Sequence, residues 1–208
     1  MIVTVSDGND LRLAKVLDAA YACFVRHGVR KTTMEDIAAE AGMSRPAVYQ
    51  YVRGKDDAYR RLAARIYDGA IQEARTAAQA PGTLAARLDR ILATKLALTQ
   101  RLFDESPYAA DLTGRGAAEL TGRNAAVAGE MERRFLTELS QLLAETITDA
   151  AADAELPLGQ EHAREIAELA LALARGLEAE HTDLERRRVR LRNGIALLIA
   201  GVAAVSRQ

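Results

Sequence analysis

Apolar residues along this chain recur at steps of three and four, a spacing that places them on one side of an α-helix. The first series predicts a helix that Gly28 ends, and its apolar members are Leu13, Val16, Leu17, Ala20 and Phe24. Two short helices are expected next, around Met34–Ala41 and Arg45–Tyr51. No segment alternates apolar and polar residues between hairpin turns, as a half-buried strand would. The pattern therefore predicts an all-α fold.

Longer helices are expected after Gly54. Their apolar stripes begin at Leu62, Leu84, Val127, Ile166 and Leu191. One more short helical piece is expected at Pro107–Arg115, which gives about nine helices in all. The change from short to long helices predicts a small three-helix domain at residues 1–54 and a larger helical bundle at residues 55–208.

Composition supports this reading and limits the classes of function. The chain is 49% hydrophobic and 27% charged, as globular proteins are. The net charge is -1, so any nucleic-acid site must come from local charge. Cys23 has no second cysteine to pair with, the N-terminus lacks a signal-peptide pattern, and Ile195–Val205 is too short to span a bilayer. A cytoplasmic protein is expected.

The most informative pattern lies within residues 32–51. Thr33 can cap the first short helix, with Asp36 in the reciprocal capping-box position. Gly42 suits the left-handed turn after that helix. Ser44 can cap the second short helix, and Pro46 suits its first turn. Two short helices joined by a tight turn are therefore predicted.

The second short helix would expose Arg45, Ala47 and Tyr49, because Val48 is expected to pack back on the first one. A helix-turn-helix places the N-terminal part of such a helix against base edges in the major groove. An ordinary helical hairpin shares the same spacing, so spacing alone leaves it open. Charge favours DNA, since residues 26–55 hold six basic and three acidic residues.

The segment Val16–Leu62 resembles the TetR/AcrR family of bacterial repressors. The matching features are Phe24 before His27-Gly28, Thr32-Thr33, Ile37-Ala38, Ala41-Gly42-Met43-Ser44, Val48-Tyr49-Gln50-Tyr51 and Gly54-Lys55-Asp56-Asp57. The chain departs from the family at Val52, where Phe is usual, and at Pro46, where Gly or a small residue is common. The resemblance covers about a quarter of the chain and implies a DNA-binding domain followed by a variable ligand-binding domain.

The resemblance implies roles for the residues of the motif. Thr33, Tyr49, Tyr51 and Lys55 would contact phosphates, and packing between the short helices is the alternative for the two tyrosines. Arg45, Ala47 and Val48 would lie nearest the bases, and Pro46 would touch a thymine methyl group or a sugar. The complete set of expected DNA-binding residues is Thr33, Ser44, Arg45, Pro46, Ala47, Val48, Tyr49, Tyr51 and Lys55.

The resemblance also implies a pocket for a small effector in the bundle. Lys95 interrupts an apolar stripe on the helix expected near Leu84–Phe103. Its ammonium either extends to water from the edge of the stripe or faces an anionic or carbonyl group of a mostly hydrophobic ligand. Inside a cavity it would need a partner, such as a carboxylate or the ligand. The expected ligand-binding residues are Ile91, Lys95, Leu98, Met131, Phe135 and Leu169.

A homodimer built from the last two helices is the third implication of the resemblance. The expected interface residues are Leu173, Gly176, Leu177, Leu191, Gly194, Ile195, Leu198, Gly201 and Val202. The glycines would let helices approach closely, and the larger residues would supply apolar area. Effector binding would favour a dimer whose two DNA-binding domains are wrongly spaced for successive major grooves, which would release a near-palindromic operator.

Other groupings of charged residues have ordinary explanations. Glu178 and His181 form a single Glu-x-x-His, half of a di-iron signature, so a solvent-facing helix end is expected rather than a metal site. The arginines at 186–192 follow a run of acidic residues, which favours charge pairing between helices. No nucleophile with its base and no phosphate loop is found, so no enzyme and no cofactor are expected. A helical protein-interaction module remains the alternative.

Overall fold

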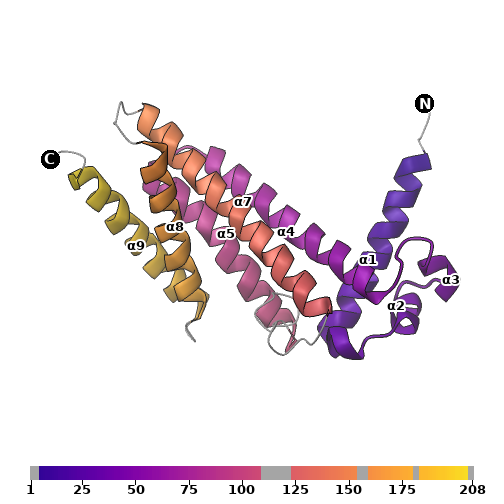
Figure 1. The fold of residues 1–208 in the computed structure, drawn as a ribbon. Helices are drawn as coiled ribbons and strands as arrows, with labels where there is room; N and C mark the ends of the chain where they lie inside the picture. Colours follow the sequence, from indigo (N-terminus) through magenta and orange to yellow (C-terminus); the bar gives the residue numbers. More distant parts are fainter. Residues whose placement is uncertain (1–4, 109–122, 154–158, 180–182, 206–208) are drawn as a thin grey trace. The chain divides into compact units, whose positions relative to one another are not determined.

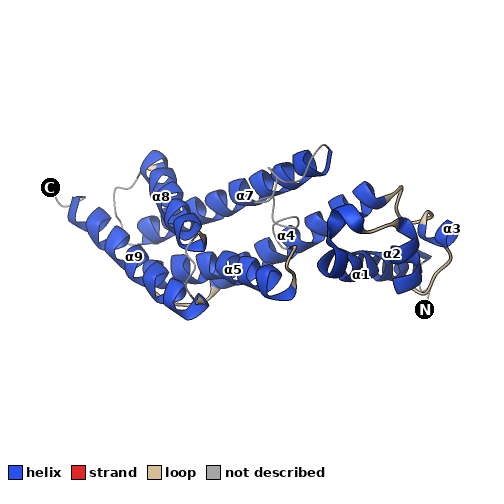
Figure 2. Cartoon of the chain, turned by 90° about the horizontal axis from the view of Figure 1, so that it is seen from below, coloured by secondary structure: helices blue, strands red, loops and turns tan. Residues whose placement is uncertain are grey.

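The computed structural model describes residues 5–108, 123–153, 159–179 and 183–205. The helices in these ranges are α1 (Val5–Lys31), α2 (Met34–Glu40), α3 (Arg45–Val48), α4 (Lys55–Gln79), α5 (Leu84–Glu105), α7 (Arg123–Asp153), α8 (Gln160–Glu178) and α9 (Leu184–Val205) (Figure 1). The described ranges contain helices and loops and no strand, so the all-α prediction is confirmed (Figure 2). The short helix expected at Pro107–Arg115 falls mostly outside the described residues.

The chain forms two compact units. Residues 1–67 and 102–133 make up the first unit, and residues 68–101 and 134–208 make up the second. The expected domain boundary after Gly54 stays a prediction. No helix in the described part of the chain is long and apolar enough to cross a membrane.

The first unit has its core between α1, α2, α3 and the first turns of α4. Phe24 of α1 and Tyr59 of α4 are buried and meet edge to face, with ring centroids 6.1 Å apart. Gly28 has φ 77°, so the regular helix breaks there as predicted. The buried hydroxyl of Thr32 donates to the carbonyl of Gly28 at 2.8 Å, which fixes the entry of the chain into α2.

The second unit is a bundle whose interior is mainly aliphatic, and in it α8 and α9 lie side by side (Figure 1). The fully buried side chains include Leu88 and Leu92 of α5, Leu139 and Leu143 of α7, and Leu191 of α9. Burial of such side chains supplies most of the favourable free energy of folding. The bundle therefore matches the long amphipathic helices that the sequence predicts.

Two arginines close the tight connection between α4 and α5. Arg87 Nε donates to the carbonyl of Ala78 at 2.8 Å, and Arg90 Nη2 donates to the carbonyl of Ala80 at 2.7 Å. The last carbonyls of a helix have no partner within the helix. These side chains of α5 therefore satisfy the C-terminal end of α4.

Candidate nucleic-acid interface

The turn between α2 and α3 has the geometry that the sequence predicts. Thr33 caps α2 in a complete capping box with Asp36, as expected. Gly42 has φ 60°, and Met43 N donates to the carbonyl of Ala38 at 2.9 Å. Ser44 then caps α3 by accepting from the amide of Ala47 at 3.4 Å. Local hydrogen bonds of this kind fix the direction of α3 relative to α2.

The side of α3 that faces solvent carries Arg45, Pro46 and Tyr49, with Ala47 half-buried beside them. Val48 is fully buried, as its predicted packing requires. A buried Val48 cannot also lie next to a base, so that part of the prediction is wrong. Arg45, Pro46 and Ala47 of α3 and its C-cap Tyr49 thus remain as candidates for contact with a DNA groove.

Arg45 is held along this surface by two neighbours. Its guanidinium lies over the ring of Tyr49, 5.6 Å from the centroid, and forms an ion pair with Glu35 of α2. The hydrogen bond with the Tyr49 hydroxyl raises the pKa of Arg45 most, and the charge of the Glu35 carboxylate raises it further. The side chain is therefore fully charged and still 55% exposed. A fixed planar cation of this kind can read a guanine edge.

The residues expected to contact phosphates differ in their exposure and in the hydrogen bonds they already make within the chain. Tyr49 is 41% exposed. The Thr33 hydroxyl donates to the Asp36 carboxylate at 2.8 Å, and Lys55 Nζ donates to the carbonyl of Arg30 at 3.0 Å. Tyr51 is half-buried and hydrogen-bonds the guanidinium of Arg12, which raises the pKa of Arg12. A DNA phosphate would have to replace or share these hydrogen bonds. For Tyr51, the contact with Arg12 and the partial burial support a packing role instead of a phosphate contact.

Two basic residues of α1 were missed by the sequence reasoning. Arg12 is exposed and reaches Tyr51, as described above. Lys15 is exposed and its Nζ lies 3.9 Å from the point that a Cβ on Gly42 would occupy. Both cations thus belong to the surface formed by the turn and the residues after α3. Their position on the polar side of the first helix was the available signal, but only the fold shows which side meets the motif.

Lys95 in the second unit is buried and paired. It is 5% exposed, and its Nζ donates to both carboxylate oxygens of Glu178 at 2.6 Å. Thr99 adds a third hydrogen bond to Glu178 at 2.8 Å. The alternative in which Lys95 extends to water is therefore wrong. The expectation that Glu178 faces solvent is also wrong, because this residue is 8% exposed.

The other expected ligand-binding residues differ in burial. Ile91, Leu98 and Phe135 are buried, Met131 belongs to the first unit, and Leu169 is 58% exposed. Leu169 cannot line an enclosed pocket when most of its surface faces solvent. The assignment of Leu169 is therefore wrong, and those of Ile91, Leu98, Met131 and Phe135 stay predictions.

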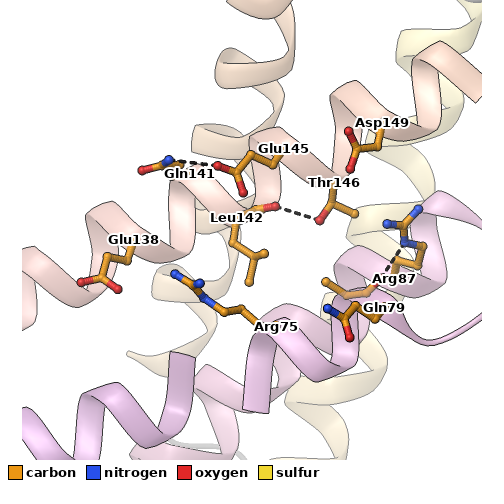
Figure 3. A pocket seen from close by; sticks show the side chains of 10 residues that line it. Arg75, Gln79, Arg87, Glu138, Gln141, Leu142, Glu145, Thr146 and Asp149 are labelled. Carbon is orange, nitrogen blue, oxygen red and sulfur yellow. Dashed lines mark hydrogen bonds between the residues drawn. The ribbon is translucent and has the colours of Figure 1, made fainter. Parts of the chain in front are cut away.

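Two clefts occur elsewhere in the second unit. The first has a volume of about 310 Å³ and is lined mostly by polar side chains of α4, α5 and α7, among them Arg75, Arg87 and Glu145 (Figure 3). The second has a volume of about 750 Å³ and lies between α7 and α8. Neither cleft includes any of the six expected ligand-binding residues.

The expected dimer residues fall into two groups. Leu177, Leu191 and Ile195 are buried within the chain, and a Cβ on Gly194 would clash with the side chain of Leu173. Leu177, Leu191 and Ile195 therefore pack within the same chain, so their assignment to the dimer surface is wrong. Gly176 and Gly201 are exposed, and Leu173, Leu198 and Val202 are partly exposed.

Comparison with known proteins gives a family for the N-terminal part. Residues 16–62 match the model of the bacterial regulatory proteins of the tetR family. The HTH-type transcriptional regulator YfiR of Bacillus subtilis (strain 168), itself uncharacterized, is 41% identical over 54 residues, which are 26% of this chain and 26% of that protein. The match thus spans about a quarter of the length of this curated relative.

Solved structures show the same fold over most of the chain. A tetR-family transcriptional regulator from Streptomyces coelicolor has a TM-score of 0.65 and 20% identity, with 94% of this chain and 83% of that chain covered. SmeT in a complex with triclosan has a TM-score of 0.64 and 21% identity, with 89% of this chain and 90% of that chain covered. At these identities the likeness establishes the architecture.

Proposed function

We propose that the chain, which matches the tetR family of bacterial regulatory proteins over residues 16–62, is a transcriptional repressor that releases its operator when it binds a small molecule. The observation that carries this proposal is the capped α2–turn–α3 unit with Arg45 and Tyr49 on its exposed side. This family is not one of enzymes, and the proposed site of action is the cytoplasm, where the DNA partner is found.

DNA recognition in this proposal depends on α3 entering the major groove. Arg45 exchanges Glu35 for a guanine edge, and Pro46 and Ala47 supply apolar contact to a thymine methyl group or a sugar. Tyr49 and Lys55 contact phosphates, joined by Arg12 and Lys15 of α1. The exchange is feasible because the pair of Arg45 with Glu35 is exposed on both sides, and exposed ion pairs contribute little.

A homodimer is proposed from apolar residues that remain exposed on α8 and α9. On α8, Leu169, Ala172 and Gly176 are exposed and Leu173 is partly so, at helical spacings of three, four and seven. On α9 the exposed apolar residues are Val189, Ala196, Leu197, Ala200 and Gly201. Exposed apolar stripes on adjacent helices support an interface with a second copy. Two copies would read a near-palindromic site.

Effector control is proposed as a shift between two states of the dimer. A small molecule that binds one state more tightly moves the population toward that state by its difference in affinity. The structural neighbour SmeT is described in a complex with triclosan, which supports a ligand site in a bundle of this architecture. Release would follow if the favoured state places the two α3 helices at the wrong spacing.

Mobility shift tests the proposal directly. The full chain should bind DNA from upstream of its own gene more tightly than unrelated DNA of equal length. Arg45→Ala should reduce this preference, because one base contact in each half-site is lost. Arg134→Ala is the matched control, because Arg134 is also 55% exposed and ion-paired but lies in the second unit. Equal affinity for both DNAs would support an interaction module without operator binding.

A further inference from the structure

Arg187 at the start of α9 is a buried cation with a hydrogen-bond donor left over. The residue is 6% exposed, and its Nη2 donates to the side-chain oxygen of Gln100 on α5. Its Nε is buried and has no hydrogen-bond partner among the described residues. A buried donor on a charged group is costly to leave unpaired. This position therefore favours a further acceptor.

The acidic side chains described around α9 and the adjacent part of α5 have other partners. Glu178 serves Lys95 and Thr99. Asp183 accepts from the amide of Arg186 at 2.9 Å, and Glu185 pairs with Arg188 at 3.5 Å. Asp89 pairs with Arg192 at 3.5 Å. The ion pairs described around α9 thus do not include Arg187, and the side-chain partner described for it is the neutral amide of Gln100.

The free donor, Nε–H, shares an edge of the guanidinium with one N–H of Nη2, the nitrogen that donates to Gln100. Nε–H and the adjacent Nη2–H point in parallel, and a carboxylate accepts from both at once in the side-on arrangement. Gln100 offers one amide oxygen to Nη2 and no charge. A carboxylate group is planar and close to a primary amide in size. It can therefore take the position of the Gln100 amide if that side chain rotates.

We propose that Arg187 is the anchor for a carboxylate of the effector, which displaces the Gln100 oxygen and supplies the missing negative charge. Gln100 is only half-buried, so this edge can be reached from solvent when its side chain moves. The effector class is thus small molecules that carry a carboxylate group. The inference rests on the proposed function, because it assumes that a small molecule controls operator binding.

Carboxylate binding at this position would change how α5 and α9 are joined. The contact between Gln100 and Arg187 links these two helices, and the pair of Lys95 and Glu178 links α5 to α8. A ligand that replaces Gln100 breaks the first link and leaves the second intact. This change is local to the second unit and gives the effector a contact that differs between two states, as a population shift requires.

Isothermal titration of the full chain with acetate, butanoate, octanoate and benzoate tests the proposal, with the primary amide of each acid as the neutral control. The wild-type chain should bind at least one acid about 10- to 100-fold more tightly than its amide, the range for charge-assisted hydrogen bonds. Arg187→Met should abolish the preference for the acid over its amide. Arg187→Lys should weaken it, because lysine keeps the charge but lacks the two parallel N–H donors. Gln100→Ala should tighten acid binding, because the competing oxygen is removed.

Arg188→Met is the matched control, since this neighbouring arginine is 44% exposed and pairs with Glu185. It should bind the acids as the wild type does. Equal affinity for acids and amides, no binding of any acid, or an unchanged preference in both Arg187 variants would overturn the proposal. Gln100→Ala and Arg187→Lys decide the question if Arg187→Met fails to fold. Operator binding measured on the same samples separates the two claims, because lost carboxylate preference with intact operator binding overturns this inference alone.

Discussion

The helix-turn-helix and the interior of the bundle use polar side chains differently. Around α2 and α3, exposed polar contacts include pairs that are close in sequence, such as Thr33 with Asp36 and Arg45 with Tyr49. In the bundle, Lys95 and Glu178 are 83 residues apart in sequence and 5% and 8% exposed. Water and salt screen the first kind of contact, and they screen the second much less.

This difference in exposure suits α3 to DNA recognition and the bundle to control by a small molecule. An exposed contact near α3 can be exchanged for a phosphate or a base at low cost, so the surface can be varied one residue at a time. A buried charge depends on every partner it has, so removing one partner changes the stability of the whole unit. A small charged molecule can act on the bundle for the same reason.

Breaking the buried pair should have the largest effect. Lys95→Met leaves the Glu178 carboxylate without its cation and should lower the free energy of unfolding by about 3–5 kcal/mol. The double variant Lys95→Met with Glu178→Leu should recover most of this loss, because it removes both charges. Urea unfolding of the three proteins provides the measurement.

Arg134→Met is the surface control for this comparison, because Arg134 is 55% exposed and pairs with Glu138 one helical turn away. It should cost about 0.5 kcal/mol or less. A Lys95→Met variant as stable as this control would contradict the contrast between buried and exposed pairs.

The exposed side of α9 should decide assembly. Leu197 is 75% exposed and Ile195 is fully buried, although both lie on the last helix. Leu197→Glu should weaken the dimer by about 100-fold, or ~3 kcal/mol, while the chain stays folded. Ile195→Glu should unfold the second unit instead. Sedimentation velocity with circular dichroism distinguishes the two, and an unmodified chain that sediments as a monomer would contradict the proposed interface.

Arg12 and Lys15 test how far the DNA-binding surface extends onto α1. Arg12→Ala should weaken binding to all sequences alike and reduce the slope of log K against log salt by about 0.9, the value for one phosphate contact. Lys15→Ala should act in the same way. Fluorescence anisotropy across a salt series gives both slopes, and a changed sequence preference at constant slope would show that Arg12 does not contact phosphate.

The smallest effect should come from the capping box. The amide and hydroxyl of Thr33 donate to Asp36 and hold its pKa below the usual range. A lowered pKa in the folded state means that the stabilisation is complete above the unfolded pKa, about 4, and is lost as the pH falls through the folded pKa. Wild type and Asp36→Asn should therefore differ in stability at neutral pH and converge in acid. A pH-independent difference would exclude the carboxylate as its cause.

How far sequence patterns predict this molecule depends on the range of the contacts. Thr33, Asp36, Gly42 and Ser44 act within a few residues of themselves, so their types and spacing were enough to predict the turn. The contact of Arg12 with Tyr51 depends on how α1 crosses the end of α3, which no local pattern encodes. The partner of Lys95 could be anticipated as a carboxylate, but not as Glu178.

The dimer surface shows a second limit. A helix such as α9 that is apolar on more than one side offers several stripes, and periodicity does not say which one the chain buries itself. Ile195 and Leu197 are equally apolar, yet one is in the core and the other faces solvent. Only the packing of α8 on α9, with Leu173 against Gly194, decides between them.

The central claim is that α3 reads DNA, and a base-by-base affinity profile of the wild type and Arg45→Ala tests it most directly. The wild-type profile should show two related half-sites. Arg45→Ala should lose about 1–3 kcal/mol of discrimination at one or two base pairs in each half-site and keep the rest of the profile. A wild-type profile without sequence preference, or one that Arg45→Ala leaves unchanged, would contradict the claim.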